Sequence, residues 1–477
     1  MLKNHISAKI REALQYEPTL GQEELIQKWA DYVVSPVENE IFLLKGYAGT
    51  GKTTMVNALV KTLDVMKMKS VLLAPTGRAA KVLSTYTGKS AYTIHKKIYR
   101  QKSSTDGFGK FALDRNLSSF TFFIVDEASM ISNYSPEGSI FGSGRLLDDL
   151  VEYVYSGRNC KLILIGDTAQ LPPVGLDVSP ALDVNELEAC FGMDVQHCQL
   201  RDVVRQSEES GILSNATHLR EKLMETDPGY PSLKLSGFPD VERIQGGDLI
   251  ETISSAHYQY GMEETMVVSR SNKRANRFNQ GIRNMILYRE EEISPGDYLM
   301  VVKNNYFWTS DVKEMDFIAN GDIVEVVRIL RHIELYGFRF AEITVRFPDY
   351  KDVEIDVMIL LDTLDIETAS LDFEESKRLF SAVAEDYMDI PSKKKRYEKI
   401  RVNPYFNALQ VKFAYAVTCH KAQGGQWSAV FVDQGYLTED MLDREYYRWM
   451  YTAITRATEK LYLVNFKQEF FPDEPEL

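Results

Sequence analysis

Short apolar runs alternate with longer amphipathic stretches along most of the chain. Such runs, rich in β-branched and aromatic residues and separated by helical periodicity, predict βαβ units with parallel strands. The runs predicted to be strands are Ile41–Leu44, Val71–Leu73, Phe120–Val125, Leu162–Ile165, Met266–Val268, Ala429–Val432 and Leu461–Val464. The pattern therefore predicts an α/β protein with a parallel sheet in each half of the chain.

The alternation breaks between about residues 294 and 401. Runs such as YLMVV, DIVEVV and EITVRF follow one another with turn signals between them, which is typical of a small antiparallel sheet or barrel. An acidic, helical stretch comes next. We interpret residues 294–400 as an insertion inside the second α/β domain.

Composition restricts the class of protein. The chain has 477 residues, enough for about three domains, and its 44% hydrophobic content, with 23 Phe and 26 Tyr, excludes extensive disorder. No apolar run approaches the roughly 18 residues of a membrane span. The polar start of the chain lacks a signal-peptide core, and the four cysteines form no CxxC pair. We expect an intracellular, cytoplasmic protein with reduced thiols, and we expect no membrane partner.

The net charge of −14 is unevenly distributed. Lys61–Lys102 contains ten basic residues and one acid, whereas Asp362–Ile390 contains nine acids and is followed by the basic run Lys393–Arg396. Such segregation permits a positive groove on an acidic protein. The alternative, that these stretches are solvated faces, is preferred for the acidic one.

The segment GYAGTGKTT at residues 46–54 fits the phosphate-binding pattern G-x-x-x-x-G-K-[ST], between a predicted strand and a predicted helix. Its glycines let backbone N–H groups face the phosphates at a helix N-terminus, so a chance glycine-rich turn is the weaker interpretation. Lys52 would bind the β- and γ-phosphates, and Thr53 would bind Mg²⁺. The nucleotide-binding residues predicted here are Gly46, Gly49, Thr50, Gly51, Lys52, Thr53 and Thr54.

About 70 residues later, a strand-like run ends at Asp126-Glu127. A carboxylate there can hold Mg²⁺, and its neighbour can polarise the attacking water beside the γ-phosphate. An Asp-Glu pair at a strand end is a weak signal alone. Combined with the phosphate loop, it predicts hydrolysis of a nucleoside triphosphate, with Thr53 and Asp126 at the metal.

Further motifs, in order, resemble those of the RecD/Dda-like group of superfamily 1 helicases over residues 19–466. The matching segments are TLGQ (19–22), APTGRAAK (74–81), TIH (93–95), DEASM (126–130), GDTAQLPPV (166–174), VRQ (204–206), TCHKAQG (418–424) and YTAITRA (451–457). The resemblance implies two RecA-like domains with ATP bound between them. It also implies 5′-to-3′ movement along single-stranded DNA and a place in DNA repair or recombination.

The resemblance also implies roles for individual residues. Gln22 would read the adenine, Gln170 would sense the γ-phosphate, and Arg205 and Arg456 would be arginine fingers. Gln423 and Gly424 would complete the nucleotide site. The residues implied to contact DNA are Pro75, Thr76, Arg78, Lys81, His95, Thr418, His420 and Lys421. Ordinary surface charges remain the alternative for Arg78 and Lys81, as does a packed, neutral ring for His95 and His420.

One position departs from the family pattern. Many members carry an acid two residues after the Gln-Gly of the 418–424 motif, where it accepts a bond from the ribose. Gln426 stands there in this chain. An amide oxygen accepts without charge, so this departure puts sugar selection in question.

The implied organisation is a first domain at 1–197, a second at 198–293 and 401–477, and an SH3-like accessory insertion at 294–400. A small hairpin insertion at about 96–118 contains Asp106-Gly107, a pair that favours a tight hairpin turn. Phe108 beyond that turn is a candidate for a strand-separating aromatic ring, unless it packs onto the core.

The sequence thus predicts an ATP-dependent 5′-to-3′ DNA helicase that uses Mg²⁺, acts on single strands and junctions, and works as a monomer. An RNA-translocating helicase of the same superfamily is an alternative, because the motifs contact mainly the backbone. A binding module switched by ATP is another. The intact set of Lys52, Glu127, Gln170 and Arg456 argues against that module.

Overall fold

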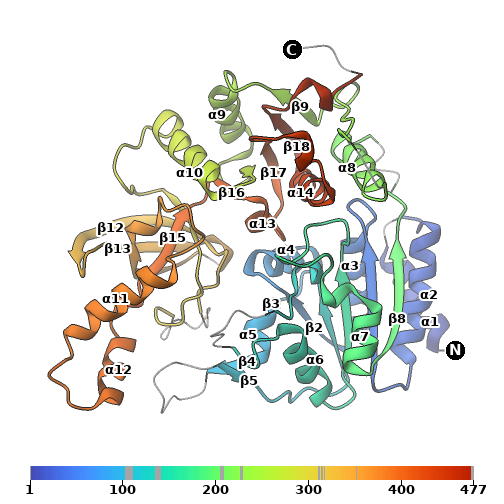
Figure 1. Cartoon of the computed structure of the whole chain (residues 1–477). Coiled ribbons are helices and arrows are strands. Elements are labelled where there is room, and N and C mark those ends of the chain that lie inside the picture. The colour runs from blue at the N-terminus through green and yellow to red at the C-terminus, as the bar shows by residue number, and fades with distance from the viewer. Residues whose placement is uncertain are drawn as a thin grey trace.

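Two parallel sheets form the body of the computed structural model (Figure 1). The structure describes residues 2–14, 16–101, 111–134, 141–204, 209–225, 229–309, 312, 315, 317–350 and 352–473. The first sheet has the order β3 (Ala91–Thr93), β2 (Lys69–Ala74), β6 (Thr121–Val125), β7 (Lys161–Gly166), β1 (Glu40–Gly46) and β8 (Asp194–Leu200). The second has the order β16 (Ala416–Thr418), β10 (Thr265–Ser269), β17 (Trp427–Asp433), β18 (Ala457–Val464) and β9 (Val241–Ile244).

The central strands are apolar along their whole length because helices cover both faces of each sheet. Every residue of β6 and of β10 is buried, as expected for parallel strands with no solvent-facing side. Each predicted apolar run forms or lies within one of these strands, apart from Phe120, which precedes β6. The predicted fold class, with two parallel α/β sheets, is confirmed.

The helices follow the strands in the βαβ order. Those of the first half are α1 (Leu2–Ala13), α2 (Leu20–Val34), α3 (Lys52–Val65), α4 (Gly77–Thr87), α5 (Ile94–Ile98), α6 (Leu146–Ser156) and α7 (Val184–Phe191). Those of the second sheet are α8 (Gly211–Lys222), α9 (Leu249–Tyr260), α10 (Asn272–Gly281), α13 (Cys419–Ala422) and α14 (Arg444–Ile454). No helix in the described ranges is both long enough and apolar enough to span a bilayer.

The segment of the second half in which strands and helices no longer alternate forms a closed barrel. Its strands are β11 (Tyr298–Val301), β12 (Ile323–Leu335), β13 (Phe338–Phe347), β14 (Val353–Leu360) and β15 (Leu409–Phe413). Along the chain, two helices, α11 (Phe373–Glu385) and α12 (Lys393–Arg401), come between β14 and β15. Both helices project from the barrel (Figure 1). The barrel agrees with the predicted accessory insertion, but its closing strand β15 lies beyond residue 400, where we placed the insertion's end.

Two short strands lie within residues 96–118, where we expect a hairpin insertion. β4 (Tyr99–Gln101) and β5 (Phe111–Leu113) pair antiparallel. The connecting residues 102–110, including Phe108, lie outside the described residues. The predicted division between the α/β domains at 197/198 falls inside β8, which continues to Leu200 as the edge strand of the first sheet.

Candidate nucleotide and nucleic-acid site

The phosphate-binding segment forms a tight loop between β1 and α3. Gly49 and Gly51 have φ angles of 74° and 78°, in the left-handed region that favours glycine. A Cβ on Gly46 would lie 2.8 Å from Cγ of Lys52, and one on Gly51 would lie 2.6 Å from Nε2 of Gln22. Gly46, Gly49 and Gly51 are therefore each required by the backbone angle or by a close neighbour. Because glycine has no side chain, the N-terminus of α3 stays open to an anion.

The side chains around this loop converge on its inner face. Nζ of Lys52 donates to the carbonyl oxygen of Tyr47 at 2.8 Å and lies 3.9 Å from Oδ2 of Asp167. Gln22, which is buried, donates from Nε2 to the carbonyl oxygen of Thr50 at 3.1 Å. Gln22 thus borders the phosphate loop, at the N-terminal end of α2, where Thr19 forms a capping box with it.

Asp126 and Glu127 stand at the end of β6, as predicted. The backbone N–H of Glu127 donates to Oδ1 of Asp126 at 2.9 Å, and Glu127 has a φ of 53°. Burial raises the pKa of Asp126 to about 6, and the neighbouring Glu127 carboxylate adds to the rise, while Lys52 opposes it. Two carboxylates held together and partly desolvated are costly alone, so they suit a divalent cation, for which Thr53 offers a hydroxyl.

Gln170 lies deep between the two halves. It is buried, and its Oε1 has no hydrogen-bond partner among the described residues. The next residue, Leu171, donates its N–H to Oγ1 of Thr452 at 2.8 Å and accepts Nε2 of Gln423 at 2.6 Å. The three predicted motifs that contain Gln170, Gln423 and Thr452 therefore meet at one point between the sheets.

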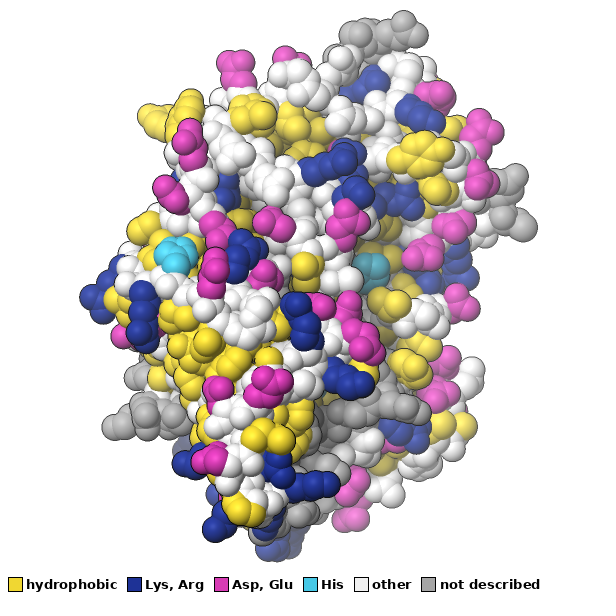
Figure 2. All heavy atoms as spheres, turned by 60° about the vertical axis from the view of Figure 1, so that its left-hand side comes forward, with side chains coloured by type: hydrophobic (Ala, Val, Ile, Leu, Met, Phe, Trp, Pro, Cys, Tyr) yellow, Lys and Arg dark blue, Asp and Glu magenta, His cyan; other side chains and the backbone are white. Residues whose placement is uncertain are grey.

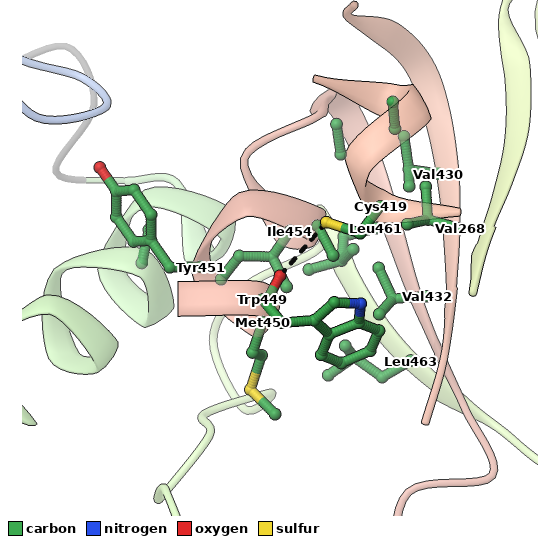
Figure 3. Close-up of a cluster of buried hydrophobic side chains, with 14 of the residues drawn as sticks. Val268, Cys419, Val430, Val432, Trp449, Met450, Tyr451, Ile454, Leu461 and Leu463 are labelled. Carbon is green, nitrogen blue, oxygen red and sulfur yellow. Dashed lines mark hydrogen bonds between the residues drawn. The ribbon is translucent and has the colours of Figure 1, made fainter. Parts of the chain in front are cut away.

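Tyr451 connects the phosphate loop to the second sheet, a role of its side chain that the sequence does not indicate. It belongs to the apolar cluster that holds α14 against β17 and β18, yet its ring points away from the other labelled side chains (Figure 3). Its hydroxyl accepts the N–H of Ala48 at 2.7 Å and donates to Oδ2 of Asp167 at 2.7 Å. One phenol thus contacts both the loop and the carboxylate beside Lys52.

The structure describes one of the two predicted arginine fingers, Arg456. Arg456 is buried, and it donates to the carbonyl oxygens of Thr452 and Gly425 at 3.0 and 3.1 Å, so its guanidinium is bound within its own half. Arg205 lies outside the described residues. Arg220 of α8, which the motifs did not indicate, lies 4.4 Å over the ring of Tyr47 and lines a cleft beside the phosphate loop.

The predicted DNA-contacting residues of α4 lie at the junction of both sheets. Thr76 caps the helix by accepting the N–H of Ala79 at 3.2 Å. A Cβ on Gly424 would approach Cβ of Ala79 to 2.8 Å, so the 418–424 motif touches this helix end. Pro75 and Thr76 are half-buried at this junction, and Thr418 is the residue before α13.

Arg78 has a different environment from the expected free charge. Its guanidinium lies 4.3 Å over the ring of Trp427 and donates to the carbonyl oxygen of Gln426 at 3.2 Å. Burial lowers the pKa of Arg78. The Gln426 amide oxygen accepts from the hydroxyl of Tyr86 at 3.3 Å. Arg78 and Gln426 therefore connect the two halves in this structure, and the DNA contact of Arg78 stays a prediction.

The barrel covers the outer side of the same helix. Lys81 forms an ion pair with Asp349, and Lys421 donates to Oδ1 of Asn320. A Cβ on Gly77 would lie 2.5 Å from Oδ1 of Asp322, whose pKa burial raises to about 7. Two predicted DNA-contacting lysines thus have barrel residues as their partners.

The two histidines differ. The ring of His95 lies 4.8 Å from that of Phe141 and 5.7 Å from that of Tyr99, and burial lowers its pKa to about 4. These contacts favour the alternative of a packed, neutral ring for His95. His420, at the start of α13, is exposed.

Comparisons with known proteins agree with this geometry. Residues 21–227 match a family model described as an AAA domain, and residues 413–464 match a UvrD-like helicase C-terminal domain. The ATP-dependent RecD2 DNA helicase of Deinococcus radiodurans is 22% identical over 93% of this chain and 50% of that protein. The ATP-dependent DNA helicase dda of Enterobacteria phage T4 is 24% identical over 82% of this chain and 86% of that protein.

Among solved structures, the Pif1 helicase from Bacteroides in complex with ADP-AlF3 and ssDNA is 13% identical. It covers 97% of this chain, and this chain covers 95% of it, with a TM-score of 0.49. Several relatives are longer proteins, and this chain spans only 38% to 50% of the length of three of them.

Proposed function

We propose that this chain, a RecD/Dda-like member of the superfamily 1 helicases, is an ATP-dependent DNA helicase that moves 5′ to 3′ along a single strand. The observation that carries the proposal is the meeting of the phosphate loop, Asp126-Glu127, Gln170 and the second-half motifs at one junction between two parallel sheets. A nucleotide at that junction would touch both halves, so its hydrolysis can change how they fit together.

The proposed chemistry uses the groups of this site in separate roles. The N-terminus of α3 and Lys52 bind the triphosphate, and Glu127 takes a proton from the attacking water as general base. Gln170 has a buried amide oxygen without a partner in the described structure, which suits a group that responds to the γ-phosphate. Arg205 and Arg456 remain the proposed arginine fingers, and Arg456 would exchange its carbonyl partners on Thr452 and Gly425 for the phosphate when it acts. Gln22 remains the residue proposed to read adenine.

The proposal includes Mg²⁺ at Thr53 and Asp126. The raised pKa of Asp126 supports this, because a cation would offset the repulsion between its carboxylate and that of Glu127. When bound, the ion would neutralise charge on the phosphates. We also propose that the protein acts as a monomer in the cytoplasm and that its substrates are single strands and junctions of DNA.

The strand would lie across the carboxyl ends of both sheets, at the residues that the motifs indicate on α4 and α13. Thr76 and Gly424 touch across the junction, so a change in the angle between the sheets would move these DNA contacts relative to one another. If the two sheets bind the DNA strand tightly in turn, each hydrolysis of ATP would move the protein along the strand. The ion pair of Lys81 with Asp349 would have to open, or rearrange, for Lys81 to bind a phosphate.

The test compares a duplex that has a 5′ single-stranded tail with the same duplex that has a 3′ tail. We expect ATP-dependent unwinding of the first alone. Glu127→Gln should keep nucleotide affinity and lose at least about a hundredfold in hydrolysis, whereas Lys52→Ala should lose nucleotide affinity as well.

Three results would contradict parts of the proposal. Unwinding from the 3′ tail would refute the direction, and hydrolysis stimulated by RNA but not by DNA would refute the substrate. Near-normal turnover in Glu127→Gln would remove that residue from the role of base.

A further inference from the structure

The short helix α12 carries a basic face that the proposed site does not use. Lys393, Lys394, Lys395 and Lys399 are all exposed. None of these four ammonium groups forms an ion pair or a hydrogen bond to a carboxylate within the described structure, although the preceding segment is rich in acids. Lys and Arg side chains gather at the lower end of the face in Figure 2.

The charges of α12 oppose the electrostatics of a helix. Three lysines occupy its first turn, which contains no acid, and this is the positive end of the helix dipole. Lys395 and Lys399 are four residues apart, where like charges destabilise a helix. The neighbouring α11 follows the ordinary rule, with Glu374 and Glu375 in its first turn. Glu398, four residues after Lys394, is the one acid of α12 and offsets only part of this charge. The remaining surplus of positive charge points to an external anion.

The opposite face anchors the helix to the barrel and leaves the lysines free. Ile400 is buried in a cluster with Leu379 and Val383 of α11. The ring of Tyr397 lies 5.6 Å from that of Phe380, and Arg396 turns toward the sulfur of Met388. The Tyr397 ring and the Arg396 guanidinium thus face inward, and the outward surface presents the four ammonium groups and the carboxylate of Glu398.

Contacts connect α12 to the hairpin. The side chain of Asn407 donates to the carbonyl oxygen of Arg401 at 2.7 Å, and Asn305 donates to the carbonyl oxygen of Asn407 at 2.8 Å. Next to Asn305, the ring of Tyr306 lies 4.3 Å from that of Phe111 on β5. The end of α12 is therefore tied through the barrel to the root of the hairpin.

We propose that α12 binds the phosphate backbone of duplex DNA ahead of the point where the strands separate. This inference rests on the proposed helicase function, and it adds a duplex-binding surface to it. A helix of nine residues is roughly 13 Å long, and a duplex of that length carries about eight phosphates, which four ammonium groups can neutralise in part.

The surface fits a duplex better than a single strand. Sites for single strands combine positive charge with exposed aromatic rings on which bases stack. The aromatic residue of α12, Tyr397, packs against Phe380 and is only half-exposed. A surface with an excess of ammonium groups and without exposed rings contacts backbone charge, which is densest on a duplex.

The experiment uses the triple variant Lys393→Gln, Lys394→Gln, Lys395→Gln in the full chain. The matched control removes the same charge from the opposite side of the molecule, outside the basic segment Lys61–Lys102, with Lys3→Gln, Lys9→Gln and Lys28→Gln on α1 and α2 (Figure 1). The side chains of these three lysines are 32–42% exposed.

Fluorescence anisotropy would measure binding to a fork with a 5′ tail and, separately, to the tail strand alone. We expect the α12 variant to bind the fork ~10-fold more weakly in low salt and to reduce the salt slope by up to about 2.7, at ~0.9 per lost contact. Affinity for the single strand, and hydrolysis stimulated by it, should remain those of the wild type. The control variant should match the wild type on both DNAs.

Equal affinity of wild type and α12 variant for the fork would overturn the inference, as would an equal loss on the single strand. A loss seen only when the fork also carries an unpaired 3′ tail would assign α12 to the displaced strand and overturn the duplex assignment. Absence of DNA-stimulated hydrolysis in the wild type would instead refute the helicase function itself, so the two failures are distinguishable.

Discussion

Replacing Asp126 with asparagine should stabilise the nucleotide-free protein and abolish its hydrolysis of ATP. Burial and Glu127 raise the pKa of Asp126 from 3.8 to about 6. At neutral pH the carboxylate is therefore ionised in the folded state against the preference of its environment. Asparagine has the same shape, and its Oδ1 can still accept the N–H of Glu127 that is bound at 2.9 Å.

The magnitude follows from the pKa difference. A shift of about 2 pH units corresponds to about 3 kcal/mol of destabilisation once both states are ionised. Because Asp126 is half-buried and keeps some contact with solvent, we expect about 1–3 kcal/mol from its removal. For a domain of this size, each kcal/mol raises the melting temperature by about 2–4 °C.

The sign of the pH dependence is a stricter test than the magnitude. Above pH 6 the folded and unfolded states both hold Asp126 ionised, so the wild type carries the full penalty. Between pH 6 and about 4 the folded state takes up a proton, and the penalty declines. The advantage of Asp126→Asn should therefore be greatest at pH 7–8 and vanish near pH 4.

Calorimetric melting at pH 8, 6 and 4.5, without nucleotide or metal, would measure this. Asp194→Asn is the control, because that carboxylate is exposed at the start of β8 and should give no change. A variant that melts at or below the wild-type temperature at pH 8 would refute the reasoning. So would a stabilisation that does not depend on pH.

Two further predictions concern the DNA side of the site. Asp349→Asn should free Lys81 and raise affinity for single strands by up to about fivefold, since Lys81 is half-exposed and an ion pair in contact with solvent is worth at most about 1 kcal/mol. Anisotropy titrations that show unchanged affinity would contradict this prediction. His95→Ala should lower stability by ~1–3 kcal/mol through the lost packing against Phe141, yet leave the pH profile of DNA affinity between pH 5 and 8 unchanged, because its pKa of about 4 keeps the ring neutral there. A wild-type titration near pH 6 that disappears in His95→Ala would show a charged ring instead.

The strands and the phosphate loop could be predicted because their signals are local. Gly49 and Gly51 need left-handed backbone angles within a few residues of Lys52, and β6 is an uninterrupted apolar run that ends at Asp126. The boundaries of the domains were harder to predict from the sequence. The strand β15 completes the barrel by pairing with β11 and β14, and no local pattern distinguishes such a strand from one of a parallel sheet.

The contacts between the two halves could not be predicted, because each depends on residues hundreds of positions apart. Arg78 belongs to a basic segment, and nothing nearby in the sequence indicates that Trp427 covers it. Tyr451 is the first residue of the motif at 451–457, and its ring packs in the apolar core. Only the fold brings its hydroxyl to Ala48 and Asp167.

These contacts determine what the motifs can do in this structure. Arg78 and Lys81, predicted as two equivalent phosphate contacts, have different partners, an aromatic ring of the second sheet and a carboxylate of the barrel. Trp427 belongs to β17 of the second sheet, whereas Asp349 belongs to the barrel, so a change in the angle between the sheets would act on Arg78 directly. On the proposed function, a strand that binds along α4 would have to compete with Asp349 for Lys81. DNA binding and closure of the nucleotide site would then be linked through α4, a link that the order of motifs along the chain does not indicate.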